Sequence, residues 1–256
     1  MGARIALVTG ATGGLGRAFV EQLVQEDGLD EIWAVARTER NLERLRDELG
    51  AYVVPLTADL ADASGLRAVE RALEEARPAV AWLVNNAGTA KMGAWNEFSV
   101  GEIERAVALN CTAVSALCLI CLPYMQRGSR ILNVSSASAF QPTPYLSLYA
   151  ATKAFELSYS RALNAELAGT GITACAVCPS WVDTDLLVRE VNGRRVAFPG
   201  LVPPEKVVAR ALRDARRGRE LSVFPLYAKY LHAAAKVVPQ RIVMATWLRM
   251  LKRYGG

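Results

Sequence analysis

Short apolar runs alternate with amphipathic stretches along the first 180 residues of the chain. Six runs rich in Val, Ile, Leu and Ala have the length and the bounding residues of buried strands, and they cover residues 4–10, 31–37, 51–59, 79–88, 129–136 and 171–180. Between the first four runs, apolar side chains recur every three or four positions, as in helices with one buried face, over residues 15–26, 40–50 and 63–76. This alternation predicts an α/β fold in which helices cover both faces of a mostly parallel sheet.

The same pattern predicts one domain spanning residues 1–256. Ser99, followed three residues later by Glu102, forms a capping box and predicts the start of a further helix. After Pro179 the alternation loosens, and Gly and Pro residues interrupt residues 183–204. We interpret this cover segment as a mobile flap over a cleft, with an ordinary surface excursion as the alternative.

The composition agrees with a folded chain. Its 256 residues are 52% hydrophobic and 21% charged, which is typical of a globular protein and sufficient for one large domain. No apolar run approaches the ~18 residues of a membrane-spanning helix. The sequence opens directly on a strand pattern, without a charged leader or a long apolar segment, so we expect a cytoplasmic protein.

The net charge of +5 comes from the C-terminal part of the chain. From Glu205 onward, 12 basic residues stand against three acidic ones. No nucleic-acid recognition motif accompanies them, so we predict no nucleic-acid partner and interpret the charge as a solvated helical face. The basic tail, residues 226–256, also has an apolar face that includes Trp247. It can dock on the domain, form a dimer contact or lie on an anionic membrane surface, and we rank these roles in that order.

Two Cys-x-x-Cys pairs superficially suggest a zinc site. Cys118 and Cys121 lie in an apolar helical pattern. Cys175 and Cys178 lie in a predicted strand, where positions three apart face opposite sides of the sheet. Four thiolates cannot converge on one ion from these places, so we predict no metal site and buried free cysteines in a reducing compartment.

A glycine-rich turn joins the first predicted strand to the first predicted helix. In "ALVTGATGGLGRAF", Thr9 is followed by Gly10, Gly14 and Gly16. Glycine allows a tight turn and a close approach of backbone N–H groups to a pyrophosphate, and the positive end of the next helix favours the same anion. The turn therefore predicts a dinucleotide site, with a glycine-rich turn that binds no ligand as the alternative.

The residue after the second predicted strand bears on the choice of cofactor. Sites that prefer NAD usually place a carboxylate about 20 positions beyond the glycines, where it binds the ribose 2′-hydroxyl. Here Ala36 is followed by Arg37, and a guanidinium can pair with a 2′-phosphate. We therefore predict NADP(H) as the preferred cofactor. The alternative is that Arg37 stacks on adenine and that NAD(H) is used as well.

Together these motifs resemble those of the short-chain dehydrogenase/reductase family over roughly residues 3–225. The resemblance rests on the order and spacing of "TGATGGLG" (Thr9–Gly16), "NNAG" (Asn85–Gly88), Asn110, "NVSS" (ending at Ser136), "YAATK" (Tyr149–Lys153) and "PSWVDT" (Pro179–Thr184). It implies a Rossmann-type, doubly wound sheet of seven strands, a small-molecule substrate and a homodimer or homotetramer. The catalytic serine of the family stands 13 residues before the tyrosine, which selects Ser136.

The resemblance also implies the site residues. Those expected in catalysis are Asn110, Ser136, Tyr149 and Lys153. Those expected to contact the cofactor, with Asp59 near adenine and residues 179–184 near nicotinamide, are Thr9, Gly10, Thr12, Gly14, Leu15, Gly16, Arg37, Asp59, Leu60, Asn86, Ala87, Gly88, Tyr149, Lys153, Pro179, Val182 and Thr184. Two positions depart from the family pattern: Gly13 stands where many NADP-using relatives have a basic residue, and Ser180 stands where glycine is usual.

The segment "SLYAATKAFE", Ser147–Glu156, carries the proton chemistry in this interpretation. Tyr149 and Lys153 are four residues apart and share a helix face. A free tyrosine has a pKa near ~10, and a neighbouring ammonium lowers it. Tyr149 would donate a proton to a carbonyl oxygen while Ser136 hydrogen-bonds the same oxygen. By the resemblance, Lys153 also binds the nicotinamide ribose, and Asn110 anchors a water that leads toward solvent.

The loop after Ser136 and the cover segment supply candidates for substrate binding, with plain core packing as their alternative role. These are Ser138, Phe140, Tyr145, Leu146, Trp181 and Leu186, with Leu187 as a further candidate. Their bulk favours a hydrophobic ketone or hydroxysteroid-like substrate, interconverted with its secondary alcohol. The enzymatic alternative is a 3-oxoacyl thioester reductase, and the alternative from another class is a catalytically silent cofactor-binding regulator. A serine hydrolase is disfavoured because the lone His232 lies far in sequence from the serine motifs.

Overall fold

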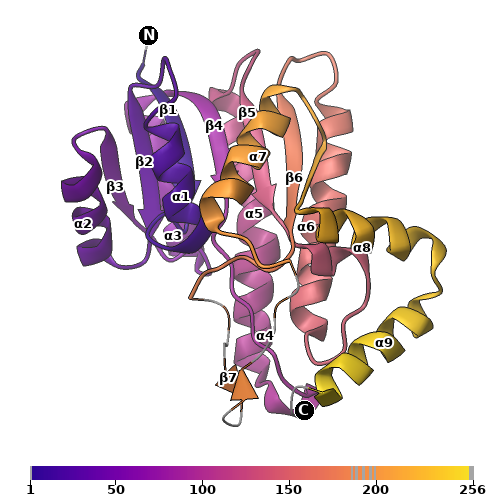
Figure 1. Ribbon diagram of the computed structural model, residues 1–256. Helices are drawn as coiled ribbons and strands as arrows, with labels where there is room; N and C mark the ends of the chain where they lie inside the picture. Colours follow the sequence, from indigo (N-terminus) through magenta and orange to yellow (C-terminus); the bar gives the residue numbers. More distant parts are fainter. Residues whose placement is uncertain are drawn as a thin grey trace.

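Seven parallel strands form the central sheet of the computed structural model, which describes residues 2–185, 187, 190–191, 194–195, 198 and 200–253 (Figure 1). In spatial order they are β3 (Val53–Thr57), β2 (Glu31–Ala36), β1 (Arg4–Thr9), β4 (Ala79–Asn85), β5 (Arg130–Val134), β6 (Thr173–Pro179) and β9 (Leu221–Phe224). The predicted sheet is confirmed, since six strands coincide with the six apolar runs and β9 is the seventh. The chain returns from β3 at the edge to β4 at the centre, so the strand order reverses between β1 and β4.

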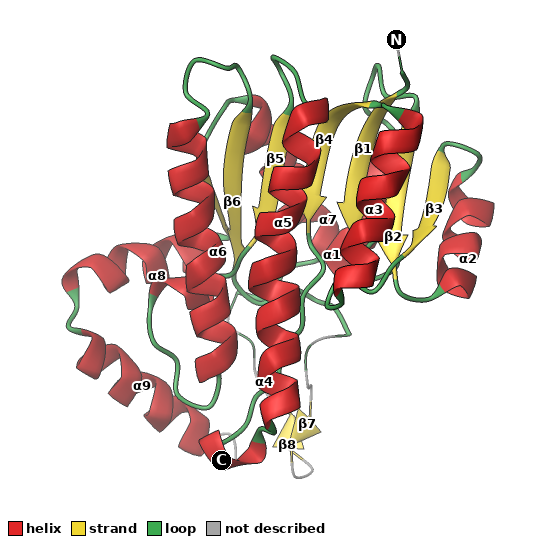
Figure 2. Ribbon diagram, turned by 180° about the vertical axis from the view of Figure 1, so that it is seen from behind, coloured by secondary structure: helices red, strands yellow, loops and turns green. Residues whose placement is uncertain are grey.

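Helices cover both faces of this sheet. One layer holds α1 (Gly14–Leu23), α2 (Glu39–Leu49) and α7 (Pro204–Arg216), and α1 and α7 lie in front of the sheet in Figure 1. The opposite layer holds α3 (Ala63–Ala76), α5 (Ala113–Cys121) and α6 (Ser147–Glu166), which lie in front of the sheet in Figure 2. In α1, α2 and α3 an apolar stripe is buried, as the spacing of the apolar residues predicts, whereas α6 buries mostly polar side chains.

The strands are apolar at successive positions because both of their faces are buried. In β1, Ala6 and Val8 belong to the core beneath α1 and α7, whereas Ile5 and Leu7 belong to the core beneath α3 and α5. All four side chains are fully buried. Alternate side chains of one strand thus fill two cores, and this packing fixes the carboxyl ends of the strands, where the candidate site lies.

A continuous helical run crosses the second layer. It begins with α4 (Val100–Val107), and the predicted capping box is confirmed because the Ser99 hydroxyl accepts from Glu102 N–H while the Glu102 carboxylate accepts from Ser99 N–H. One turn of π-helix, η2 (Ala108–Thr112), joins α4 to α5. The run Val100–Tyr124 is long and apolar enough to cross a membrane, which the sequence pattern did not indicate. Half of its apolar window is buried within the domain, so it is a core helix.

The cover segment and the tail lie beyond the parallel sheet. In the cover segment, β7 (Glu190–Val191) and β8 (Arg194–Arg195) form an antiparallel pair. The tail forms α8 (Leu226–Val237) and α9 (Gln240–Arg253), which extend away from the sheet beside α6 (Figure 1). Short 3-10 turns are η1 (Trp95–Glu97), η3 (Leu122–Tyr124) and η4 (Ala137–Phe140).

Candidate active site

Backbone geometry explains the glycines between β1 and α1. Gly10 and Gly14 have φ angles of 62° and 52°, in the left-handed region that other residues rarely adopt. A Cβ on Gly16 would lie 2.0 Å from the carbonyl oxygen of Gly10, so this position admits only a hydrogen atom. Gly13 is the N-cap residue of α1 and provides no side-chain hydrogen bond, and N–H groups at the positive end of a helix fit a phosphate. Thr12 and Leu15, the other predicted members of the turn, are half-buried.

Hydrogen bonds of Thr9 and Asn86 join the carboxyl end of β1 to that of β4. Thr9 Oγ1 accepts hydrogen bonds from the N–H groups of Asn86 and Ala87, at 2.9 Å each. Asn86 Nδ2 donates to the carbonyl oxygens of Thr9 and Gly10, at 3.0 and 3.3 Å. These residues therefore meet where the strand order reverses, which is the position at which doubly wound sheets bind dinucleotides.

Charged side chains gather after β2 and β3. Arg37 is exposed directly after β2. Asp59 pairs with Arg105 of α4, with 2.6 Å between Oδ2 and Nη2, and Leu60 beside it is buried in the core. Burial raises the pKa of Asp59, but the hydrogen bonds from Arg105 and from Ala61 N–H outweigh burial and lower it below its usual value. The sequence did not indicate Arg105, because no local pattern links α4 to the end of β3.

Asn110 lies in the π-helical turn η2 and is fully buried. Its Oδ1 accepts from Thr89 N–H at 2.9 Å, and its Nδ2 donates to Thr89 O at 2.9 Å and to Thr152 Oγ1 at 3.0 Å. A Cβ on Gly88 would lie 3.3 Å from Asn110 Oδ1 and 3.4 Å from Lys153 Nζ, so the loop after β4 approaches both side chains closely. Asn110 thus ties this loop to α6, and π-helical turns are frequent at functional sites.

The two serines after β5 have different surroundings. Ser135 is buried and donates to Lys153 O at 2.7 Å, so it joins the strand to α6. Ser136 Oγ accepts from Ser138 N–H at 3.2 Å and donates to no other described residue, which leaves its hydroxyl proton available. Ser138 Oγ is buried and has no hydrogen-bond partner within the described ranges.

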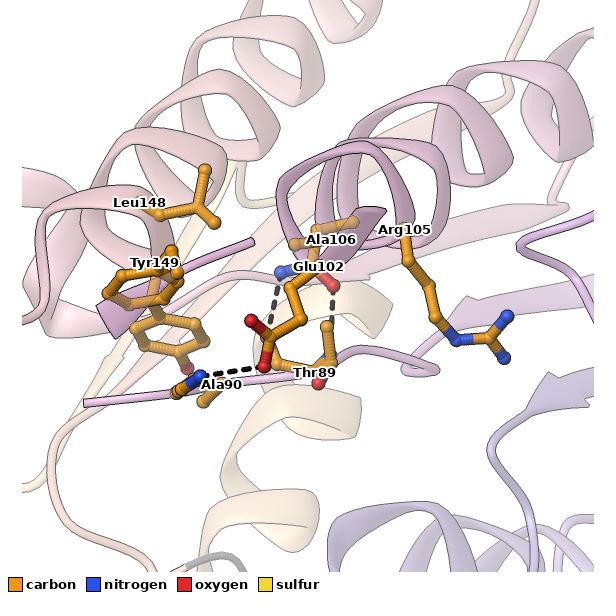
Figure 3. A pocket seen from close by; sticks show the side chains of 10 residues that line it. Thr89, Ala90, Glu102, Arg105, Ala106, Leu148 and Tyr149 are labelled. Atoms are coloured by element: carbon orange, nitrogen blue, oxygen red, sulfur yellow. Dashed lines mark hydrogen bonds and ion pairs between the residues drawn. The ribbon is translucent and has the colours of Figure 1, made fainter. Parts of the chain in front are cut away.

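Tyr149 lies in the first turn of α6 and lines a pocket of about 340 Å³. Figure 3 shows Tyr149 and Leu148 on one side of this pocket and Glu102 and Ala106 of α4 on the other, with Arg105 directed away from Tyr149. No other described residue hydrogen-bonds the phenol hydroxyl, so this group is free to meet a ligand. The remaining lining residues are Thr89, Ala90, Lys91, Phe98 and Asn110.

A surface ion pair borders this pocket. Lys91 Nζ lies 2.6 Å from Glu102 Oε1 and 5.0 Å from the centre of the Phe98 ring. Lys91, together with the Ser99 N–H and hydroxyl, lowers the pKa of Glu102 to about 2. The sequence identified Glu102 only as a cap of α4, and the fold adds it and Lys91 to the wall of the pocket.

Lys153 is buried on the face of α6 that carries Tyr149, and its Nζ lies 5.6 Å from the centre of the Tyr149 ring. Nζ donates to Val134 O at 2.8 Å and to the two carboxylate oxygens of Glu156 at 2.8 and 3.0 Å. Burial alone lowers the pKa of Lys153, but the charge of Glu156, with Tyr149 and Cys111 beyond it, raises the pKa above its usual value. Lys153 therefore carries a positive charge beside the phenol.

The segment after β6 returns to the glycine turn. Val182 pairs with Val202 in a parallel bridge, which anchors the segment at the start of α7. A Cβ on Gly14 would lie 3.1 Å from Thr184 Cγ2. Thr184, expected near the cofactor, therefore lies against the turn that precedes α1.

Two of the predicted substrate residues lie among aromatic rings. The Trp181 ring centre lies 5.1 Å from that of Phe198 and 6.4 Å from that of Trp247 in α9. Phe140 stacks on His232 of α8, with 4.5 Å between ring centres, so one face of this ring packs on the tail.

The remaining predicted substrate residues do not form one group. Tyr145, with a φ of 63°, is half-exposed. Leu146 occupies the N-cap position of α6. Leu187 N–H donates to Thr184 O at 3.2 Å. Leu186 lies outside the described residues.

Trp247 was expected only as part of the apolar face of the tail. Its Nε1 donates to Pro144 O at 2.8 Å, in the loop between η4 and α6. With the Trp181 contact, this bond places α9 against the domain, which is the first-ranked of the three predicted tail positions.

The cysteines lie apart in the fold. Cys118 and Cys121 are buried in α5, whereas Cys175 and Cys178 belong to separate core clusters on β6. The strand argument for opposite faces is confirmed. Within the part of the chain that is described, no three His, Cys, Asp or Glu side chains are grouped as metal ligands.

A comparison with known families defines the class of protein. The family described as "short chain dehydrogenase" matches residues 4–194. The chain belongs to the short-chain dehydrogenase/reductase family and is an oxidoreductase that acts on CH–OH and C=O groups. Membership in this family implies a nucleotide cofactor and a small-molecule substrate.

Solved structures of the family resemble this chain over most of its length. A short-chain dehydrogenase from Sphingobium yanoikuyae in complex with NADPH is 32% identical, with a TM-score of 0.78 over 94% of this chain and 95% of that one. The bulky-bulky ketone specific alcohol dehydrogenase from Comamonas testosteroni is 28% identical, with a TM-score of 0.73 over 92% and 93%. The 3-ketoacyl-(acyl-carrier-protein) reductase from Brucella melitensis, complexed with NADH, is 27% identical, with a TM-score of 0.74 over 86% and 95%.

Proposed function

We propose that this protein is an NADP(H)-dependent oxidoreductase that interconverts a hydrophobic ketone and its secondary alcohol. The observation that carries the proposal is the pair of Tyr149 and Lys153, in which a buried, charged Nζ lies 5.6 Å from the ring of a phenol that lines an open pocket. A nearby ammonium stabilises phenolate and so makes the phenol a better acid at neutral pH. The family match supplies the reaction class, and this pair supplies the proton.

Each polar side chain has a role in the proposed reaction. When it is bound, the reduced nicotinamide supplies a hydride to the carbonyl carbon. Tyr149 donates its proton to the carbonyl oxygen, and the available hydroxyl proton of Ser136 donates a second hydrogen bond to that oxygen as charge develops. Lys153 keeps the phenol acidic and binds the ribose hydroxyls. Asn110, fixed by Thr89 and Thr152, anchors the water through which a proton returns from solvent.

The cofactor would be held at three places. Its phosphates would lie at the turn Gly10–Gly16, where a Cβ on Gly13 meets nothing within 4 Å and the N-terminus of α1 is open. Thr184 would close over the same turn, and Asp59 and Arg37 would flank adenosine. Because one relative above is in complex with NADPH and another with NADH, the preference for NADP(H) rests on Arg37 alone.

The proposed substrate is a bulky ketone, hydroxysteroid-like in size. The aromatic group of Trp181, Phe198 and Trp247 supports this choice, since such rings bury large apolar ligands. The name of the Comamonas relative points to the same class. We further propose a cytoplasmic location, a single domain and a homodimer or homotetramer.

A second candidate is reduction of a 3-oxoacyl thioester. The Brucella relative carries that name, and the basic tail could attract an acidic carrier. Oxidation of NADPH with a bulky aryl ketone and, separately, with acetoacetyl-CoA separates the two. A kcat/KM larger for acetoacetyl-CoA by tenfold or more would replace the first proposal by the second.

The first test is a fluorescence titration of the purified protein with NADPH and with NADH. We expect NADPH to bind about tenfold or more tightly than NADH, as charge-assisted contacts to the 2′-phosphate would give. Equal binding of both would remove the cofactor preference and leave the enzyme proposal standing. Binding of neither would contradict the proposed function.

A further inference from the structure

A buried carboxylate contacts the ammonium on which the proposed chemistry depends. Lys153 and Glu156 are three residues apart on α6, so they share one helix face. Only 4% of Lys153 and 1% of Glu156 is exposed. The Nζ–Oε1 distance is 2.8 Å, which is that of a charge-assisted hydrogen bond. No motif in the sequence gave Glu156 a role.

The contacts of Nζ use all of its donors. An ammonium has three N–H groups, and here they reach Val134 O and the two oxygens of Glu156. Lys153 can therefore bind a ribose hydroxyl only by giving up a bond to Val134 or to Glu156. The carboxylate thus competes with the cofactor for the same ammonium.

Few other charges reach this pair. The titratable groups that interact with Glu156 are Lys153 on its own helix, Cys111 from η2 and Cys178 from β6, and Tyr149 interacts with Lys153. Burial raises the pKa of Cys111 to about 11 and that of Cys178 to about 12, so both thiols are neutral at physiological pH. The charge felt by Tyr149 from this cluster is set by Lys153 and Glu156.

We infer that Glu156 is a positioning residue that holds Lys153 in the cofactor-free protein and offsets the positive charge that Lys153 presents to Tyr149. The inference rests on the proposed function for the pairing of Tyr149 with Lys153. A lone ammonium favours phenolate, whereas an ammonium paired with a carboxylate has little net charge and favours it less. Removal of the Glu156 charge should therefore favour phenolate at Tyr149.

The test belongs in the alkaline range, where phenols titrate. Burial raises the pKa of Glu156 above its usual value, against the lowering effect of the Lys153 charge. In the alkaline range the carboxyl is ionised, so the wild-type protein and a variant without the charge should differ there.

The test measures the titration of Tyr149 in the cofactor-free protein. Phenolate absorbance is recorded against pH for each protein and for the same protein with Tyr149→Phe added, and the difference between the two curves belongs to Tyr149. Glu156→Gln keeps an oxygen for Nζ and removes the charge. We expect Tyr149 to lose its proton about one pH unit or more lower in this variant. Glu156→Met, which has similar bulk and no charge, should shift it in the same direction and serves if the glutamine variant does not fold.

Two controls separate charge from structure. Glu156→Asp retains a carboxylate and should leave the Tyr149 titration within a few tenths of a unit of wild type. Asp214→Asn removes another carboxylate, 1% exposed and paired with Arg210 of α7, and should not move Tyr149. An unmoved titration in both uncharged variants overturns the inference.

Enzyme assays then distinguish this inference from the proposed function. With an alcohol substrate, the pH at which kcat/KM reaches half of its alkaline maximum should be lower in Glu156→Gln than in the wild-type protein. If the wild-type protein oxidises no alcohol and reduces no ketone while the absorbance shift is present, the proposed function fails and the role of Glu156 stands. If the absorbance does not shift, the role of Glu156 fails whatever the activity.

Discussion

The centre of the candidate site and the region that we propose as its mouth are held in different ways. At the centre, Asn110, Ser135 and Lys153 are buried, and their hydrogen bonds join the loop after β4, the end of β5, η2 and α6. At the mouth, α9 meets the domain through the Trp247–Pro144 hydrogen bond and the contact with Trp181. The tail helices also leave large apolar side chains exposed, namely Leu226, Tyr230, Val237 and Ile242.

This difference suits the two tasks of an oxidoreductase. Proton transfer needs atoms placed to a fraction of an ångström, which buried and fully bonded side chains on helices and strands provide. Substrate choice needs a surface that can change without disturbing the core, and regions with few buried contacts open and vary most easily. We therefore expect changes at the centre to abolish turnover and changes at the mouth to alter preference.

The largest expected effect is at the centre. Tyr149→Phe should lower kcat by about 1,000-fold, because it removes the proton donor, with little change in NADPH binding. The measurement is steady-state NADPH oxidation together with a fluorescence titration. Tyr159→Phe, on the same helix and stacked on Phe155, is the control and should retain activity. Equal activity of wild type and Tyr149→Phe would place the proton donor elsewhere.

The glycine turn should respond next, through stability as well as binding. Gly16→Ala would place a Cβ 2.0 Å from Gly10 O, and we expect a loss of about 1–3 kcal/mol in the free energy of unfolding. The rise in Tm on adding NADPH should also disappear, because the turn must shift.

Gly13 provides a matched control for this change. A Cβ at Gly13 meets nothing within 4 Å, and its φ of −157° is ordinary extended backbone. Gly13→Ala should cost less than about 1 kcal/mol and keep the Tm response to NADPH. An equal loss in both variants would mean that the close approach of Gly16 to Gly10 is unimportant.

The edge of the cofactor site should discriminate between cofactors. Arg37→Ala should raise the dissociation constant for NADPH about 10- to 100-fold and leave that for NADH unchanged, since only NADPH carries the 2′-phosphate. Parallel fluorescence titrations measure this ratio. Arg40→Ala, three residues further on, is the control for a general loss of positive charge. A similar loss for both cofactors would assign Arg37 to adenine stacking.

The smallest effect is expected at the mouth. Trp247→Ala removes both the ring and the hydrogen bond to Pro144, and it should lower kcat/KM for a bulky ketone about three- to tenfold while sparing a small ketone. Trp247→Phe should fall between wild type and alanine. Trp95→Ala is the control, because Trp95 is 87% exposed. A uniform loss for large and small ketones would show that α9 supports the centre and not the mouth.

The sequence by itself determined the strand–helix order, the glycine turn and the helix that carries Tyr149 and Lys153. These features follow from local rules: buried parallel strands are apolar at every position, glycine is required where φ is positive, and residues four apart share a helix face. The capping box at Ser99 and Glu102 is likewise a local signal that predicts the start of a helix. Each signal lies within a few residues of the element that it specifies.

Only the tertiary structure decided which distant groups meet. Periodicity shows which face of a helix is buried but not what lies opposite, so Arg105 beside Asp59 and Trp247 on Pro144 could not be foreseen. Glu156 stands within the quoted "SLYAATKAFE" segment, yet its importance depends on burial that removes both charges from water. A surface pair at the same spacing would be screened and would do little. The fold, by excluding solvent, turns this common spacing into a control on the charge of Lys153.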